Sequence, residues 1–302
     1  MARVSERVPQ AASVNPGVIE IEDPSVFMRV VAISDVHGMY APLLGLLSAG
    51  KVTNANGDWI AGSTLLIVIG DSIDKGPQSL EVLNLWTKLQ EQSAKAGGRL
   101  VHLLGNHEAE FLADPKNDKK ASELLDELRA QKIPVSDLTS FTTPRGSFLH
   151  AEPLALKVGN WLFFHSGFYP EMDWNLFVGQ ARTVLSAADY GNDFMIGKDS
   201  VLEKKDWEKD EALLATELSS MDAIGVYGIA FGHQPEAFHV AGRSAAKANG
   251  RLIKIDNGMA PEAGSHPGSL LVFTSPAQLK LKKYPDVQVV LPGGSIRKLV
   301  PE

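Results

Sequence analysis

A short run of Val, Ile and Leu that ends in Asp, Asn or His beside a glycine recurs five times along this chain. Such runs are continuous rather than alternating, which is typical of strands buried on both faces of a sheet. Strands are predicted at residues 28–33, 65–69, 100–104, 161–164, 224–231, 252–255 and 270–273. Helices are predicted between them, at residues 42–49, 79–96, 121–131, 174–188 and 206–222. This alternation predicts an α/β sandwich.

The polar residues that follow five of these strands form the clearest candidate site. A single Asp or Asn after a strand is usually a turn former or a helix cap, but five such clusters in order favour one shared site. Open α/β sheets bind ligands at the carboxyl ends of their strands. The clusters are Ser34-Asp35-Val36-His37-Gly38, Gly70-Asp71-Ser72-Ile73-Asp74-Lys75-Gly76, Gly105-Asn106-His107-Glu108, His165-Ser166-Gly167 and Gly232-His233-Gln234-Pro235. Four other histidines lack such neighbours and are expected to be structural: His102, His150, His239 and His266.

Composition excludes several classes of protein. The 302 residues carry 29 basic and 36 acidic side chains, a net charge of -7, so neither nucleic acid nor an anionic membrane is expected as a partner. No run approaches the roughly 18 apolar residues that a spanning helix needs. The absence of cysteine excludes disulfides and thiol nucleophiles.

The chain is predicted to form one domain with two insertions. Residues 1–26 have no signal-peptide core and are interpreted as a polar lead-in, so a cytoplasmic location is expected. Residues 27–302 are predicted to be a single domain, with insertions at about 111–145 and 168–223. Long insertions at strand ends commonly determine substrate selectivity.

The five clusters together resemble the motif series of the calcineurin-like metallophosphoesterases. Gly-Asn-His-Glu and the second Asp of Gly-Asp-Ser-Ile-Asp are similar to the phosphoprotein phosphatase branch of that superfamily. Pro144-Arg145-Gly146 and Ile255-Asp256-Asn257-Gly258-Met259 resemble the bacterial Shewanella-like phosphatases. The resemblance implies a four-layer αββα sandwich with two mixed β-sheets and inserted helices.

The same resemblance implies a site for two divalent metal ions. By the family pattern, Asp35 and His37 bind the first ion, Asp71 bridges both, and the second is completed by Asn106, His165 and His233. Mixed nitrogen and oxygen ligands suit manganese, which is expected here, and are also compatible with iron, zinc or cobalt. Two cations roughly 3.5–4 Å apart can share a hydroxide and clamp a phosphoryl group.

The family pattern also assigns proton transfer and phosphate binding. His107 is the expected general acid, and Asp74 is the carboxylate expected to orient it. The family usually has arginine where this chain has Lys75, and lysine lacks the bidentate fork. Lys75, Arg145 and Asn106 are the candidate phosphate-binding residues, with Arg145 expected to supply the missing fork.

These residues predict a metal-dependent phosphomonoesterase, a hydrolase whose substrate is a phosphorylated protein or a small phosphoester. A protein phosphatase acting on phosphoserine, phosphothreonine or phosphotyrosine is the leading hypothesis. Hydrolysis of symmetrical dinucleoside tetraphosphates is the second, and a non-catalytic protein-docking module on the same fold is a third, from another class. Aromatic residues of the insertions, such as Phe141 and Trp174, are expected to pack in the core rather than to form a rim that binds phosphotyrosine. The oligomeric state stays open.

Overall fold

Two β-sheets packed face to face form the centre of the molecule. The structure is a computed structural model that describes residues 15–117, 119 and 121–302. Within these residues each sheet has six strands. The first sheet has the order β1 (Val18–Ile21), β5 (Ala155–Val158), β6 (Trp161–Phe164), β7 (Gly228–Phe231), β9 (Leu252–Lys254) and β8 (Ala245–Lys247). The second has the order β12 (Ile296–Lys298), β11 (Val287–Val290), β10 (Leu270–Phe273), β2 (Arg29–Ile33), β3 (Thr64–Ile69) and β4 (Arg99–Leu103).

Both sheets are mixed, as the resemblance implies. Strands β2, β3 and β4 are parallel, whereas β10 and β11 join them in antiparallel pairs. In the other sheet, β6, β7 and β9 are parallel, whereas β5 pairs antiparallel with β6. The carboxyl ends of three neighbouring parallel strands therefore lie together in each sheet.

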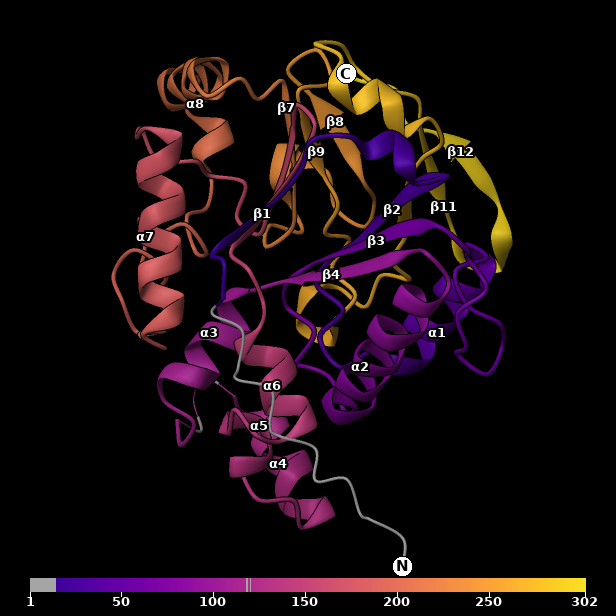
Figure 1. The fold of residues 1–302 in the computed structure, drawn as a ribbon, viewed down its shortest axis with the longest axis vertical. Helices are drawn as coiled ribbons and strands as arrows, with labels where there is room; N and C mark the ends of the chain where they lie inside the picture. The colour runs from indigo at the N-terminus through magenta and orange to yellow at the C-terminus, as the bar shows by residue number, and fades with distance from the viewer. Residues whose placement is uncertain (1–14, 118, 120) are drawn as a thin grey trace, which may run out of the picture.

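Helices cover the outer face of each sheet and complete the four layers. Helices α1 (Tyr40–Ala49), α2 (Ser79–Lys95) and α4 (Ser122–Gln131) share one apolar cluster with β2 and β3. Helices α7 (Trp174–Ser186) and α8 (Glu211–Ala223) share another with β6 and β7. A third cluster lies between the sheets. Figure 1 shows α7 and α8 on one side of the sheets and α1 and α2 on the other. The predicted αββα sandwich is confirmed.

The pattern of strand β2 explains why its apolar run is continuous. Val31 and Ile33 face the helical layer, whereas Val30 and Ala32 face the other sheet. Because successive side chains of a strand point to opposite faces, a strand between two apolar layers has no polar position. Strand β3 repeats the pattern, with all six residues buried.

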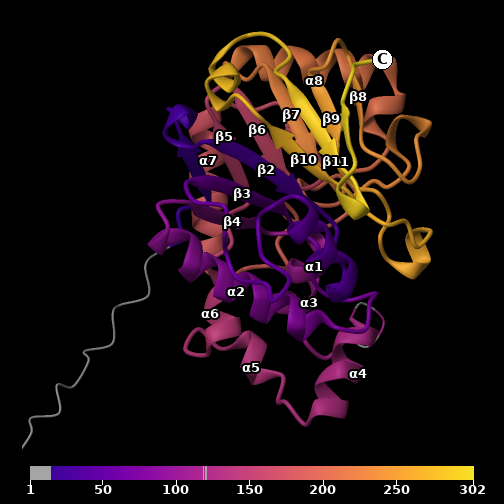
Figure 2. The ribbon, with the colours of Figure 1, turned by 90° about the vertical axis from the view of Figure 1, so that its right-hand side faces the viewer.

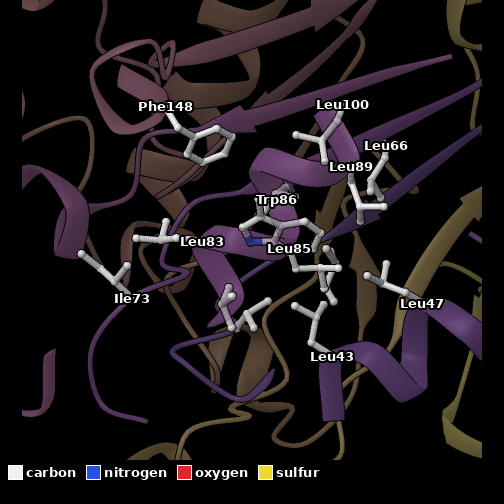
Figure 3. Close-up of a cluster of buried hydrophobic side chains, with 14 of the residues drawn as sticks. Leu43, Leu47, Leu66, Ile73, Leu83, Leu85, Trp86, Leu89, Leu100 and Phe148 are labelled. Atoms are coloured by element: carbon white, nitrogen blue, oxygen red, sulfur yellow. The ribbon is translucent and has the colours of Figure 1, made fainter. Parts of the chain in front are cut away.

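Helix α2 places its apolar stripe against the sheet. Leu80, Leu83, Trp86 and Leu89 lie at helical spacing, and all four are buried in the cluster that Figure 3 shows. The helix ends at Lys95, just before the glycine pair that the sequence indicates as its end. The helix begins directly after the loop that carries Asp71 and Asp74, so its packing fixes one end of that loop.

The insertion at about 111–145 forms a small helical group at one end of the molecule. It contains part of α3 (Asn106–Ala113), then α4 and α5 (Ser136–Thr139), and it leads into α6 (Pro144–His150). Figures 1 and 2 both show α4, α5 and α6 together at the end opposite the C-terminus. Only α4 is predicted from the sequence; the other three helices are short, and no apolar stripe marks them.

Strand β1 lies within the segment interpreted as a polar lead-in. Residues 1–14 of that segment lie outside the described residues, but Val18–Ile21 pairs in parallel with β5. The proposed division into a lead-in and one domain stays a prediction, and so does the cytoplasmic location. Among the described helices, none has both the length and the apolar character that a bilayer crossing requires.

Glu217 on α8 should make the stability of the fold depend on pH. Its carboxylate accepts a hydrogen bond from the backbone N–H of Tyr169 (2.8 Å), and burial raises its pKa to about 8. Burial keeps the folded carboxyl group protonated at pH values where the unfolded one has already ionised. The free energy of unfolding is therefore highest at acidic pH and falls as the pH rises towards 8. Glutamine keeps the acceptor oxygen and cannot ionise. We therefore expect the melting temperature to fall less between pH 5 and pH 8 in Glu217→Gln than in the wild type; parallel melting curves would contradict this assignment.

Candidate metal centre

The strand ends of both sheets converge on one site. In one sheet, Asp35 and His37 follow β2, Asp71 follows β3, and Asn106 follows β4. In the other sheet, His165 follows β6 and His233 follows β7. All six side chains are buried. Two groups of ligand atoms form within 4.8 Å of one another, His37 with Asp71 and His107, and Asp71 with His165 and His233. Asp71 belongs to both groups, as a bridging ligand must.

The backbone at these strand ends is strained in a consistent way. Six non-glycine residues of the site adopt the left-handed conformation, each at a cost of about 1–3 kcal/mol that the surrounding packing must offset. They are Asp35, His37, Asp71, Asp74, Lys75 and His233. Glycine is needed at Gly105, where a Cβ atom would collide with the Asp71 carboxylate. The Gly-Asn-His-Glu motif therefore lets two strand ends approach each other closely.

The first group has an imidazole nitrogen free to bind an ion. Nδ1 of His37 lies 3.1 Å from the carbonyl oxygen of Ile73, so it carries the proton and donates it there. This leaves Nε2, 3.6 Å from Oδ2 of Asp71, as an electron-pair donor. Burial lowers the pKa of His37 to about 3, which keeps the ring neutral.

The second group is oriented in the same manner. Nδ1 of His165 donates to the carbonyl of Ile69 (2.9 Å), and its Nε2 lies 3.4 Å from Oδ1 of Asp71 and 3.1 Å from Oδ1 of Asn106. Nε2 of His233 donates to the carbonyl of Glu203 (3.2 Å), which leaves its Nδ1 free. Backbone carbonyls thus fix the donor nitrogen of each histidine, an arrangement typical of metal ligands.

The site concentrates negative charge that calls for cations. Burial, and then the charge of Asp256, raises the pKa of Asp35 well above its usual range, and burial raises the pKa of Asp256 to about 6. Burial would also raise the pKa of Asp71, but the charges of His165 and His107 outweigh it and hold that pKa well below its usual range. Three buried carboxylates among imidazole nitrogens are a donor set suited to divalent cations.

Asp35 lies at the site but outside the two groups. Both of its carboxylate oxygens are 3.0 Å from the backbone nitrogen of His233, which donates to them, and Ser34 donates its hydroxyl to the same carboxylate. Asp35 therefore ties the end of β2 to the end of β7. Its predicted role as a metal ligand stays a prediction.

His107 and Asp74 form the pair expected for proton transfer. Nδ1 of His107 lies 3.3 Å from Oδ2 of Asp74, while Oδ1 accepts the N–H of Leu124 (3.3 Å) at the start of α4. Burial lowers the pKa of His107, but the charge of Asp71 and the bond to Asp74 outweigh it and raise that pKa above its usual value. A raised pKa favours the protonated ring that a general acid requires. The membership of His107 in the first group leaves a ligand role as the competing assignment.

A polar pocket of about 360 Å³ opens above these residues. Asp74, Asn106, His107 and His233 line it, together with Lys75, Lys119 and Lys205. A second pocket, of about 520 Å³, also has Lys205 and His233 in its wall. Open space therefore continues beyond the metal-ligand groups on the side of Lys205 and His233.

The structure does not bring Arg145 into this pocket. Its guanidinium donates to Asp137 and, at 2.9 Å, to Asn84. The bidentate fork is thus occupied elsewhere, and Lys205 lies at the site instead. Lys205 stands inside the insertion at 168–223 with no motif around it, so nothing in the sequence marks it as a site residue.

Most aromatic residues of the insertions pack in the core as expected, but Phe141 does not. Phe148, Tyr169 and Phe177 are buried, and Phe168 and Trp174 pack against the same core as Phe177. Phe141 is half exposed and stacks on His150, with ring centroids 3.6 Å apart. None of these aromatic residues lines the pocket above His107.

Glu108 is a second residue whose role the sequence did not reveal. Its buried carboxylate accepts the backbone N–H groups of Asp71 (2.9 Å), Ser72 (2.7 Å), Ile73 (3.3 Å) and Gly105 (3.1 Å). The last residue of the Gly-Asn-His-Glu motif therefore holds the loop after β3 rather than an ion. Its partners are 35 to 37 positions away in the sequence, apart from Gly105.

The chain belongs to the calcineurin-like phosphoesterase family, whose model matches residues 28–237. Shewanella-like protein phosphatase 1 of Plasmodium berghei is 30% identical over 142 residues, which are 46% of this chain and 39% of that protein. A symmetrical bis(5'-nucleosyl)-tetraphosphatase of a Janthinobacterium strain is 29% identical over 182 residues, 60% of this chain and 53% of that enzyme. The chain thus spans less than two thirds of these curated relatives.

A solved structure extends the likeness over most of the fold. The cold-active protein-tyrosine phosphatase of a psychrophilic Shewanella species has a TM-score of 0.73 and 23% identity, over 94% of this chain and 82% of that chain. At this identity the comparison establishes the shared architecture. Family membership implies divalent metal ions, and the two groups around Asp71 are residues able to bind them.

Proposed function

We propose that this chain is a metal-dependent phosphomonoesterase that removes phosphate from phosphorylated protein side chains. One observation carries the proposal: the Asp71 carboxylate is shared by two groups whose imidazole nitrogens are held ready by backbone carbonyls. The similarity to Shewanella-like protein phosphatases supports a phosphoprotein as the substrate.

In this proposal two divalent cations, manganese first among the compatible metals, are held by Asp71 and its neighbours. Asp35 and His37 belong to one ion, and Asn106, His165 and His233 to the other. When bound, such ions lower the pKa of a water molecule and neutralise charge on the phosphoryl oxygens. His107, held by Asp74, gives a proton to the leaving oxygen, and Lys75 pairs with a phosphoryl oxygen in the pocket.

The second pocket favours a peptide over a dinucleotide. Among the described residues, its wall contains charged, small and imidazole side chains, including Lys205, Glu236 and His266, but no Phe, Tyr or Trp, the larger rings on which bases usually stack. The relatives named as symmetrical bis(5'-nucleosyl)-tetraphosphatases make the dinucleotide the substrate to test against.

The test compares substrates on the manganese-loaded protein. We expect turnover of p-nitrophenyl phosphate and of phosphoserine, phosphothreonine or phosphotyrosine peptides, and far less release of ADP from diadenosine tetraphosphate. A strong preference for the dinucleotide would replace the proposed substrate. No turnover of any substrate by a protein that binds no metal would favour the non-catalytic docking role.

Lys75→Ala should weaken the handling of the phosphate group. Lys75 lines the pocket beside His107, and hydrogen bonds to charged groups contribute about 1.5–3 kcal/mol. We therefore expect kcat/KM for a phosphopeptide to fall by about ten- to one-hundredfold. Lys116→Ala is the matched control, because Lys116 is exposed on the insertion and does not line this pocket. Equal kcat/KM values in the two variants would remove Lys75 from the site.

A further inference from the structure

Four buried polar side chains form a network of close contacts beneath the loop that carries Asp71. Nε1 of Trp86 donates to Oγ of Ser72 (2.9 Å), which lies 2.7 Å from Nε2 of His102. Nδ1 of His102 lies 2.9 Å from Oε1 of Glu152, a close contact that lacks the alignment of a hydrogen bond. All four residues are almost fully buried, and they come from α2, the loop after β3, strand β4 and the segment before β5. Figure 3 shows Trp86 within the apolar cluster on α2.

The hydrogen bonds of this network hold the Ser72 hydroxyl from two sides. An indole N–H can only donate, so the Ser72 oxygen accepts from Trp86, and the same hydroxyl is hydrogen-bonded to Nε2 of His102. Burial lowers the pKa of His102 to about 4, so the ring is neutral and adds no positive charge beneath the site.

The position of Ser72 connects this network to the metal centre. Ser72 directly follows Asp71, whose left-handed backbone has a φ of 53°. Glu108 holds the backbone N–H groups of both residues, while His102 and Trp86 hold the Ser72 side chain. The turn is therefore fixed from its backbone and from its side chain, and neither contact uses the Asp71 carboxylate.

We propose that Trp86, Ser72, His102 and Glu152 act as positioning residues, which hold the Asp71 turn so that its carboxylate faces both imidazole groups. This inference rests on the proposed function, because Asp71 is taken as the shared ligand. Residues that orient a ligand through hydrogen bonds commonly change metal affinity by 10–100-fold when removed. His102, which has no metal-capable neighbour in the sequence, thereby gains a role.

The experiment measures Mn²⁺ affinity by calorimetry, and separately kcat and KM for p-nitrophenyl phosphate. We expect Ser72→Ala and His102→Leu each to weaken Mn²⁺ binding by about 10–100-fold and to lower kcat with little change in KM. Because Ser72 and His102 act through the same network, the double variant should bind Mn²⁺ only slightly more weakly than either single variant. Glu152→Leu should behave like them, whereas Glu152→Gln, which keeps a polar side chain of the same shape against Nδ1, should retain most of the affinity.

Ser93→Ala is the control for a merely structural effect. Ser93 is fully buried and lines the same cavity of about 220 Å³ as His102 and Glu152, but it is not a member of the network of Trp86, Ser72, His102 and Glu152. It should change the melting temperature without changing Mn²⁺ affinity. Wild-type Mn²⁺ affinity in folded Ser72→Ala and His102→Leu would overturn the inference. A wild-type protein that binds Mn²⁺ but hydrolyses no phosphoester would instead overturn the proposed function alone.

Discussion

Asp71→Asn is expected to remove both metal ions together and to reduce turnover by on the order of 10³-fold or more. Asparagine keeps the shape of the side chain but has one oxygen and no charge, so it cannot serve two cations. The carboxylate lies between His37 and His165, at 3.6 and 3.4 Å from their nitrogens, and neither group is complete without it. Bound cations stabilise the transition state by several kcal/mol, which sets the size of the effect.

The measurement is metal content by elemental analysis after reconstitution with manganese, together with kcat for p-nitrophenyl phosphate. Asp58→Asn is the control, because Asp58 pairs with Lys88 at the surface and should leave both values unchanged. An Asp71→Asn variant that loses one ion and keeps the other at wild-type affinity would show that Asp71 serves a single site.

His107→Ala is expected to lower kcat by about 10²–10⁴-fold while leaving the metal content at the wild-type level. The reason is that the ring lies against Asp74, which with Asp71 raises its pKa and so favours the protonated form that can give up a proton. The loss should be largest with a phosphoserine peptide, whose alkoxide leaving group needs a proton. It should be smaller with p-nitrophenyl phosphate, whose leaving group is a much weaker base.

Asp74→Asn provides the matched comparison for His107. It should produce the same dependence on the leaving group with a smaller loss, because the ring remains and only its orientation and pKa change. If His107→Ala instead releases one ion and affects both substrates equally, His107 is a ligand together with His37 and Asp71.

The elements best predicted from the sequence are those buried on both faces. Strands β2 and β3 were found because a strand between two apolar layers has no polar position. Strand β1 was missed because it is four residues long and its Glu20 is exposed, so nothing distinguishes it from a loop. Edge strand β12, with two of its three residues exposed, lacks a signal for the same reason.

The site shows a similar division. Residues that follow a strand in a glycine-flanked motif, such as Asp71 and His165, could be found because the fold brings strand ends together. Lys205 and Glu152 could not be found, because their positions depend on how long insertions return to the core. Arg145 was assigned from its motif alone, and the acceptor groups of Asp137 and Asn84 determine where its guanidinium lies.

The placement of one centre across two sheets has a consequence for how the protein holds together. Asp71 and His37 extend from one sheet, whereas His165 and His233 extend from the other, so an ion bound among them also joins the two sheets. The free energy of cation binding then adds directly to the free energy of folding. A chelator would therefore loosen the sandwich at the end where these ligand groups lie, and metal-loaded molecules should survive heat or a protease longer than metal-free ones.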